Sequence, residues 1–277
     1  MDLYVSDLDG TLLNSDKEIS NFSKDKLNRL INKGLQFTVA TARTPATAVD
    51  ILKGINITLP VAMMNGVLIY DINENKYIDI KKIKDSSVIK VLDIFKEHKK
   101  NCFVYAIKDN HLWVYHKDFT CSMEENFYDE RCNKPLKTFI KVADYYKASE
   151  GSEIINFIIF DKLEIVKPIY DKLKIIEGIT VDYYRDIYGD GYFLEAYSSE
   201  ASKANAINLL SNYVDSDRLI TFGDNVNDIP MFKISDECYA TENATESLKK
   251  IATAVISSNN DDGVAKFILE KNKRFFK

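Results

Sequence analysis

The sequence has 277 residues, of which 45% are hydrophobic and 29% are charged, and its formal net charge is -5. This is the composition of a globular protein with one large domain or two moderate ones. The negative charge argues against a nucleic-acid binder, which usually has a basic face, and no apolar run reaches the roughly 20 residues that cross a bilayer.

The first part of the chain alternates between strand-like and helix-like segments. Apolar runs predict strands at 3–5, 36–40 and 61–64, and helical periodicity predicts helices at 20–33 and 45–53. Gly34 is placed to end the first helix, and Pro45 is placed to begin the second. This βαβαβ order predicts a parallel sheet wrapped by helices.

From residue 67 onward the pattern changes. Residues 67–71 and 76–80 resemble a hairpin, and 85–99 form one amphipathic helix. The segments that follow are strands at 102–107, 112–116, 136–142 and 153–160, a helix at 162–174, and strands at 179–184 and 192–196. Such a mixture predicts an α+β block inserted into the α/β frame.

The alternating order resumes near residue 201. A helix is predicted at 201–212, a strand at 219–222, a helix from about 227, and a final helix at 262–271. We therefore predict an α/β fold with a Rossmann-like parallel sheet core. The core would be discontinuous, formed by residues 1–82 and 189–277, with the inserted domain at 83–188.

The cysteines and the first residues predict a cytoplasmic location. Cys102, Cys121, Cys132 and Cys238 form no C-x-x-C pair and do not have the spacing of a zinc site, as expected for isolated thiols in a reducing compartment. The first residues lack the basic start and apolar stretch of a signal peptide. Nothing in the sequence sets the oligomeric state.

The strongest chemical signal is the segment Asp7-Leu8-Asp9-Gly10-Thr11-Leu12. Two carboxylates lie two residues apart, directly after an apolar strand. Ligands bind at the carboxyl ends of strands in an open α/β sheet, so this position suits a site. An acidic turn that merely ends a strand is an equally acceptable interpretation of this segment alone.

A second acidic segment, Phe222-Gly223-Asp224-Asn225-Val226-Asn227-Asp228, also follows an apolar strand and opens a helix. A helix cap explains one acidic or amide residue, but it does not explain four. Several carboxylates at one end of a sheet repel each other without a cation. Oxygen-rich sites of this kind suit Mg²⁺.

Three further residues gain meaning from their order along the chain. Thr41 ends the second strand, where its hydroxyl could donate to a phosphate oxygen or cap the following helix. Arg43 could pair with a phosphate or a substrate anion. Lys203 begins a helix between the two acidic segments, and by itself it would be interpreted as a solvated surface residue.

Together these segments resemble the four motifs of the haloacid dehalogenase superfamily, and more closely the Cof-like phosphatases with a type IIB cap. The matching stretches, in family order, are Asp7–Leu13, Ala40–Arg43, Asn65-Gly66, Ser202–Ala204, Phe222–Asp228, Asn243-Ala244 and Asn259–Ala265. The inserted domain matches the cap in position and size. The sequence departs from the subfamily at Ala42, where Gly is usual, and the added methyl would shift the loop that carries Arg43.

The resemblance implies a magnesium-dependent phosphatase acting on a small phosphorylated metabolite, such as a sugar phosphate. Asp7 would attack phosphorus and form an aspartyl-phosphate, while Asp9 would serve as general acid and then general base. The implied Mg²⁺ ligands are Asp7, the Asp9 carbonyl and Asp224. The implied phosphate or substrate contacts are Leu8, Thr41, Ala42, Arg43, Lys203 and Asn227, with Asp228 orienting Lys203. The cap would select the leaving group.

Two alternatives stay open at this point. Phosphomannomutases also carry a type IIB cap, so the chain could be a phosphomutase that returns the phosphate to its substrate. A binding protein that kept the fold without catalysis is the other alternative. The intact set of acidic and basic motif residues argues against it, since lost function usually shows as a missing member.

Overall fold

The protein is described by a computed structural model covering residues 2–186 and 189–273, and it divides into two compact units. Unit 1 comprises Met1–Asp79 and Ser202–Lys277, and unit 2 comprises Ile80–Ala201. The predicted combination of an α/β core and an inserted α+β block is confirmed. The second boundary of the inserted unit lies after Ala201, whereas the sequence predicted this boundary after residue 188. The reason is that the strand at Tyr192–Ser198 pairs within the sheet of unit 2.

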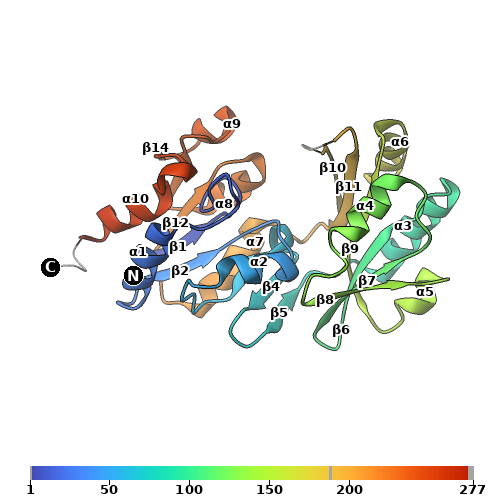
Figure 1. The fold of residues 1–277 in the computed structure, drawn as a ribbon, viewed down its shortest axis with the longest axis horizontal. Helices are drawn as coiled ribbons and strands as arrows, with labels where there is room; N and C mark the ends of the chain where they lie inside the picture. The colour runs from blue at the N-terminus through green and yellow to red at the C-terminus, as the bar shows by residue number, and fades with distance from the viewer. Residues whose placement is uncertain (1, 187–188, 274–277) are drawn as a thin grey trace. The chain divides into compact units, whose positions relative to one another are not determined.

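Unit 1 is built on a five-stranded parallel sheet with the strand order β14-β13-β12-β1-β2 (Figure 1). Its strands are β1 (Asp2–Ser6), β2 (Gln36–Val39), β12 (Arg218–Gly223), β13 (Glu237–Thr241) and β14 (Ala254–Ile256). Strand β1 has β12 on one side and β2 on the other, so its carboxyl end lies between two neighbouring strand ends.

Helices cover both faces of this sheet, as the predicted wrapped sheet requires. They are α1 (Asn21–Ile31), α2 (Pro45–Leu52), α7 (Lys203–Leu210), α8 (Ile229–Ile234), α9 (Glu246–Lys249) and α10 (Gly263–Lys271). Leu3 and Val5 of β1 share one apolar cluster with residues of α7 and α8. Tyr4 faces the other way, where its hydroxyl accepts a hydrogen bond from Asn272 at 2.9 Å, directly after α10.

One prediction about this sheet is wrong. Strand β3 (Val61–Met63) was expected in the parallel sheet, but it pairs antiparallel with β4 (Leu68–Asp71) in a separate sheet that β5 (Lys76–Ile80) completes. Only an isolated parallel bridge, Ala40 to Ala62, links it to the end of β2. A strand of three residues offers few ladder bonds, and the 3-10 turn η1 (Met64–Gly66) returns the chain at once for the antiparallel pairing.

Unit 2 is a six-stranded sheet with the order β10-β11-β9-β6-β7-β8, antiparallel except for the β7–β8 pair. Its strands are β6 (Phe103–Lys108), β7 (His111–His116), β8 (Lys137–Lys141), β9 (Glu153–Asp161), β10 (Ile179–Arg185) and β11 (Tyr192–Ser198). Helices α3 (Asp85–Glu97) and α6 (Leu163–Leu173) bury Val91, Phe95, Val166 and Ile169 in its core.

Two short helices of unit 2 were not predicted, namely α4 (Ser122–Asp129) and α5 (Tyr145–Ala148). Helix α4 buries only Glu124 and Phe127, and α5 is a single turn, so neither shows an apolar stripe long enough to be recognised. The structure also has 3-10 turns at η2 (Ser211–Tyr213), η3 (Val226–Asp228) and η4 (Asn259–Asp261). In the described part of the chain, no helix has the length and apolar character that a membrane span requires.

Candidate active site

The two acidic segments meet because their strands are neighbours. Strands β1 and β12 run parallel with Ser6 opposite Phe222, and the Asp7 amide donates to the Phe222 carbonyl at 3.0 Å. Both strands therefore end at the same edge of the sheet, and the residues that follow, Asp7 and Asp224, leave the sheet side by side. This edge is the place where open α/β sheets bind ligands.

A buried ammonium group connects these segments to helix α7. Lys203 Nζ donates to Asp7 Oδ1 at 2.5 Å and to Asp228 Oδ1 at 2.6 Å. Lys203 is only 1% exposed, Asp7 5% and Asp228 0%. Ser202 caps the helix by accepting from the Asn205 amide at 3.0 Å, so the lysine leaves from a fixed first turn.

Two glycines allow the carboxylates to approach the backbone this closely. Gly10 has φ +79°, and a Cβ there would lie 2.4 Å from Asp224 Oδ2. A Cβ at Gly223 would lie 2.6 Å from Asp228 Oδ2. A side chain at either position would push a carboxylate out of the cluster, which explains the glycine in both acidic segments.

The three carboxylates differ in how many oxygens are already used. Both carboxylate oxygens of Asp228 already accept hydrogen bonds. Oδ1 accepts from Lys203, and Oδ2 accepts from the amides of Asp224 at 2.9 Å and Asn225 at 3.1 Å. Asp7 uses Oδ1 for Lys203, and Asp224 uses Oδ1 to accept from Thr11 at 3.1 Å. Among the described residues, the second oxygens of Asp7 and Asp224 accept no hydrogen bond, so these two can bind something else.

Burial sets the protonation behaviour of the cluster. Burial raises the pKa of Asp7 to about 8 against the lowering effect of Lys203, and Asp228 raises it further. Burial, reinforced by Asp228, also raises the pKa of Asp224 to about 6. For Lys203, burial alone lowers the pKa, but Asp7 and Asp228 outweigh it, so its pKa is raised and the ammonium stays charged.

This donor set suits a divalent cation. One carboxylate oxygen each from Asp7, Asp224 and Asp228 can be chosen so that all three lie within 4.8 Å of one another. The cluster holds three carboxylates against one ammonium, so it has an excess of buried negative charge. Hard oxygen ligands without thiols or imidazoles favour Mg²⁺ over softer metals.

Asp9 and Arg43 lie in contact, an arrangement that the sequence did not predict. Arg43 Nε donates to Asp9 Oδ2 at 2.7 Å and Arg43 Nη2 to Asp9 Oδ1 at 2.5 Å, which is a two-pronged ion pair. The Asp9 side chain is 50% exposed and does not belong to the buried cluster. Ala42 is exposed and has no positive φ, so the conformation of this loop does not require the glycine that is usual here.

Thr41 and Leu8 are held in place by backbone contacts. The Thr41 amide donates to Ala62 O at 2.9 Å, and its hydroxyl accepts from the Arg43 amide at 3.1 Å. Leu8 is fully buried, and its carbonyl accepts from Leu13 at 2.9 Å. Among the described residues, the amide groups of Leu8 and Asp9 donate to no acceptor, so they are free to bind an anion.

Asn227 contacts a residue in a strained turn. Its Nδ2 donates to Asn65 Oδ1 at 3.2 Å, and both Met64 and Asn65 have left-handed φ values, 51° and 54°. Left-handed backbone at non-glycine residues is uncommon and concentrates at functional sites. Asn65 lies in one of the stretches that match the family, but the sequence alone indicates no role for it.

Two asparagine side chains, those of Asn243 and Asn259, hold the first acidic loop in a way that the sequence did not predict. Asn243 Nδ2 donates to Gly10 O at 2.8 Å, and Asn243 Oδ1 accepts from the Asn259 amide at 3.1 Å. Asn259 Nδ2 in turn donates to Leu13 O at 2.8 Å. Both asparagines lie in matching stretches, so the signal was present. Its meaning depends on contacts across more than 200 residues of sequence.

Comparisons with known proteins agree on one family. The model of a family described as haloacid dehalogenase-like hydrolase matches residues 4–268. A curated relative, the 5-amino-6-(5-phospho-D-ribitylamino)uracil phosphatase YitU of Bacillus subtilis, is 26% identical over 271 residues, covering 97% of this chain and 96% of the relative.

Solved structures share the fold over nearly the whole chain. A haloacid dehalogenase-like hydrolase from Bacteroides thetaiotaomicron has a TM-score of 0.78 at 22% identity, covering 98% of this chain and 99% of that one. The subclass IIB sugar phosphatase BT4131 has a TM-score of 0.73 at 20% identity, covering 98% of this chain and 99% of that one.

The raised pKa of Asp7 predicts how the metal-free protein responds to pH. The folded protein binds this proton more tightly than the unfolded chain, whose reference pKa is 3.8. The free energy of unfolding should therefore fall as pH rises from about 4 to about 8 and then level off. Urea unfolding in EDTA measures this. Between pH 6 and 8 Asp7→Asn should flatten the slope, and an unfolding free energy that rises over this range would contradict the assignment.

Removal of the buried Lys203 ammonium group should destabilise the protein strongly. Lys203→Met leaves three carboxylates without a counter-charge, so we expect a loss of about 3–5 kcal/mol in the free energy of unfolding at pH 8. The loss should shrink at pH 5, where Asp7 is protonated. Lys250→Met, at an exposed position, is the matched control and should change little. An equal loss of stability in the two variants would contradict this role of the Lys203 ammonium group.

Proposed function

The chain belongs to the haloacid dehalogenase-like hydrolase family, and from this membership we propose that it is a magnesium-dependent phosphatase that forms an aspartyl-phosphate on Asp7. The family resemblance derived from the sequence motifs is confirmed. One observation carries the proposal: a carboxylate with a free oxygen, Asp7, lies in a buried cluster whose negative charge exceeds its single ammonium.

The proposed metal ligands are Asp7, the Asp9 carbonyl and Asp224. Asp7 and Asp224 fit this role because each keeps one carboxylate oxygen that accepts no hydrogen bond among the described residues. Asp228 is a positioning residue, since Lys203 and two backbone amides occupy both of its oxygens. The bound Mg²⁺ would neutralise charge on the phosphate oxygens.

The proposed reaction has two steps. Asp7 attacks phosphorus, the bond to the leaving oxygen breaks, and Asp9 supplies the proton that the leaving oxygen takes up. Asp9 then removes a proton from water, which attacks the phosphorus of the aspartyl-phosphate. The bond between phosphorus and the Asp7 oxygen breaks, so inorganic phosphate leaves and the Asp7 carboxylate is restored. Lys203, Thr41 and the amides of Leu8 and Asp9 are proposed to bind the phosphate oxygens, together with Asn227.

The contact between Arg43 and Asp9 gives the proposal a gating step. In the structure Arg43 forms a two-pronged ion pair with the Asp9 carboxylate. Before Asp9 can donate a proton, this pair must separate and the freed carboxylate must take up a proton from water. A substrate phosphate is a competing anion for the guanidinium, so its arrival can transfer Arg43 from Asp9 to the substrate.

The proposed substrate is a small phosphorylated metabolite, with a sugar phosphate as the leading example. One curated relative is named for a phosphorylated ribitylamino compound, and one solved neighbour is described as a sugar phosphatase. We propose that unit 2 (Ile80–Ala201), which corresponds to the expected type IIB cap, selects the leaving group. The proposed location is the cytoplasm, where the four cysteines, all free thiols in the structure, would stay reduced.

Loss of the nucleophile should abolish hydrolysis of p-nitrophenyl phosphate. With Mg²⁺ present, Asp7→Asn should lower kcat/KM by on the order of 10³-fold or more. EDTA should remove the activity of the unsubstituted protein, and added Mg²⁺ should restore it. Asp215→Asn, at an exposed position, serves as the matched control. Comparable activity in the two variants would end the proposal.

Arg43 is expected to act on substrate binding. Arg43→Met should raise KM about tenfold with a smaller change in kcat, because a charge-assisted contact to the substrate anion is lost. Arg29→Met is the control, since Arg29 forms a similar ion pair with Asp25 on an exposed helix face. If kcat falls while KM is unchanged, Arg43 acts on Asp9 alone and its assignment as a substrate contact is wrong.

A further inference from the structure

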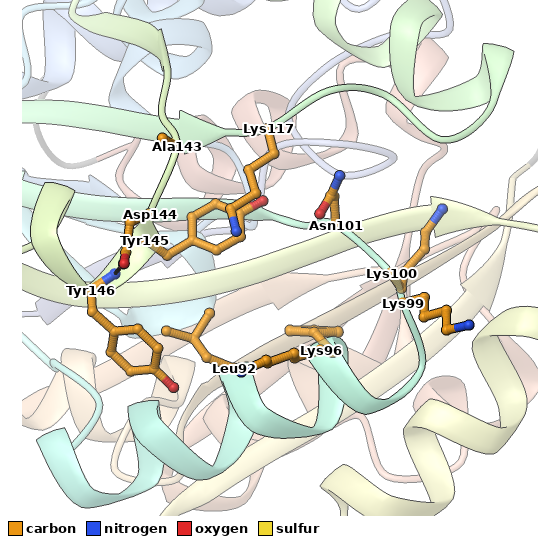
Figure 2. Close-up of a pocket in the computed structure, with 11 residues that line it drawn as sticks. Leu92, Lys96, Lys99, Lys100, Asn101, Lys117, Ala143, Asp144, Tyr145 and Tyr146 are labelled. Atoms are coloured by element: carbon orange, nitrogen blue, oxygen red, sulfur yellow. Dashed lines mark hydrogen bonds between the residues drawn. The ribbon is translucent and has the colours of Figure 1, made fainter.

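Unit 2 contains a pocket that the proposed reaction does not use. It has a volume of about 320 Å³ and lies between the end of α3, the segment after β7 and the start of α5 (Figure 2). Its lining includes Leu92, Phe95, Lys96, Lys99, Lys117 and Tyr145. All of them belong to unit 2, and none is shared with the acidic cluster of unit 1. This volume lies within the range of small-molecule sites and is larger than a free inorganic ion needs.

The side chains in the walls of the pocket are held by hydrogen bonds and ion pairs. The Tyr145 hydroxyl donates to Cys102 O at 2.6 Å and accepts from the Cys102 amide at 3.1 Å, which fixes its ring. The Lys100 ammonium is anchored behind the wall by Glu124 at 2.7 Å, Asp161 at 2.5 Å and Thr120 at 2.8 Å. With Leu92 and Phe95 buried beside them, these side chains form a floor that is partly apolar and partly polar.

The rim of the pocket is cationic. Among the described residues, Lys96, Lys99 and Lys117 have no acidic partner, in contrast to Lys100. Figure 2 shows Lys117 passing over the Tyr145 ring, with Nζ 4.7 Å from the ring centre. Asp144 is the one acidic lining residue, and its Oδ1 already accepts from the amides of Tyr146 and Lys147.

The charge around this pocket is opposite in sign to the net charge of the chain. In a chain with a net charge of -5, three ammonium groups without an acidic partner among the described residues surround one partly apolar depression. Like charges repel, so an anion bound between these ammonium groups would lower the energy of the arrangement. The apolar part of the floor favours a ligand that also has an apolar body, because an inorganic anion would leave this surface exposed to water.

We propose that this pocket binds a small organic anion, a compound with a planar aromatic body and one carboxylate, sulfonate or phosphate group. The aromatic body packs on Leu92, Phe95 and the Tyr145 ring. The anionic group lies at the rim between Lys96, Lys99 and Lys117. This site is separate from the proposed phosphatase centre and does not depend on that assignment.

Isothermal titration calorimetry of the full chain with 2-naphthoate tests the proposal. This probe carries the required chemistry but is not a phosphate ester, so it avoids the proposed reaction. We expect saturable binding with a dissociation constant below about 1 mM, and binding at least about tenfold weaker for the neutral analogue 2-naphthylmethanol. Inorganic phosphate alone should bind this site weakly.

Matched substitutions locate the binding. Lys96→Gln with Lys117→Gln should weaken 2-naphthoate binding by about tenfold or more, because two charge-assisted contacts are lost. Lys147→Gln with Lys162→Gln, at exposed positions outside the pocket, should leave it unchanged, and so should Asp7→Asn. No saturable binding, equal binding of the neutral analogue, or no effect of the pocket variant would each overturn the proposal. If the pocket variant does not fold, the comparison of the two probes on the unsubstituted chain still decides it.

Discussion

The structure of the site depends on one buried ammonium group. Lys203 lies between Asp7 and Asp228 with almost no solvent contact, and it is the only cation hydrogen-bonded to either carboxylate in the described part of the chain. The single positive charge of Lys203 does not balance the cluster, because Asp224 adds a third carboxylate to those of Asp7 and Asp228. The folded protein therefore has two ways to balance the cluster: it can hold a proton on a carboxylate, or it can bind a divalent cation. This choice would connect its pH dependence with its proposed metal binding and its proposed chemistry.

The fold makes this imbalance possible by bringing distant segments to one sheet edge. Strands β1 and β12 are neighbours, so their ends place Asp7 and Asp224 together without a long loop. The loop after β1 is then fixed by Asn243 and Asn259, which bind its carbonyls from the C-terminal part of the chain. Glycine at position 10 leaves the space that the Asp224 carboxylate fills. These contacts hold the carboxylates of Asp7 and Asp224 closer together than like charges would remain in water.

Much of this arrangement could be predicted from the sequence. Apolar strands followed by acidic residues indicated the sheet edge, and the order of the motifs indicated the family. What the sequence could not supply was pairing across space. Strand β3 is too short for its partner to be deduced, and α5 is a single turn. The ion pair between Arg43 and Asp9 was missed because each residue had been assigned its own role, and nothing in the spacing shows that their side chains meet. The role of Asn243 and Asn259 likewise depends on contacts rather than on residue type.

The most direct test of the central claim is a calorimetric titration of the metal-stripped protein with Mg²⁺ at pH 7, repeated in two buffers with different heats of ionisation. If the acidic cluster holds a proton that the cation displaces, binding should release roughly one proton, and Asp224→Asn should abolish high-affinity binding. Binding that releases no proton, or binding that is the same in the Asp224→Asn variant, would contradict the account.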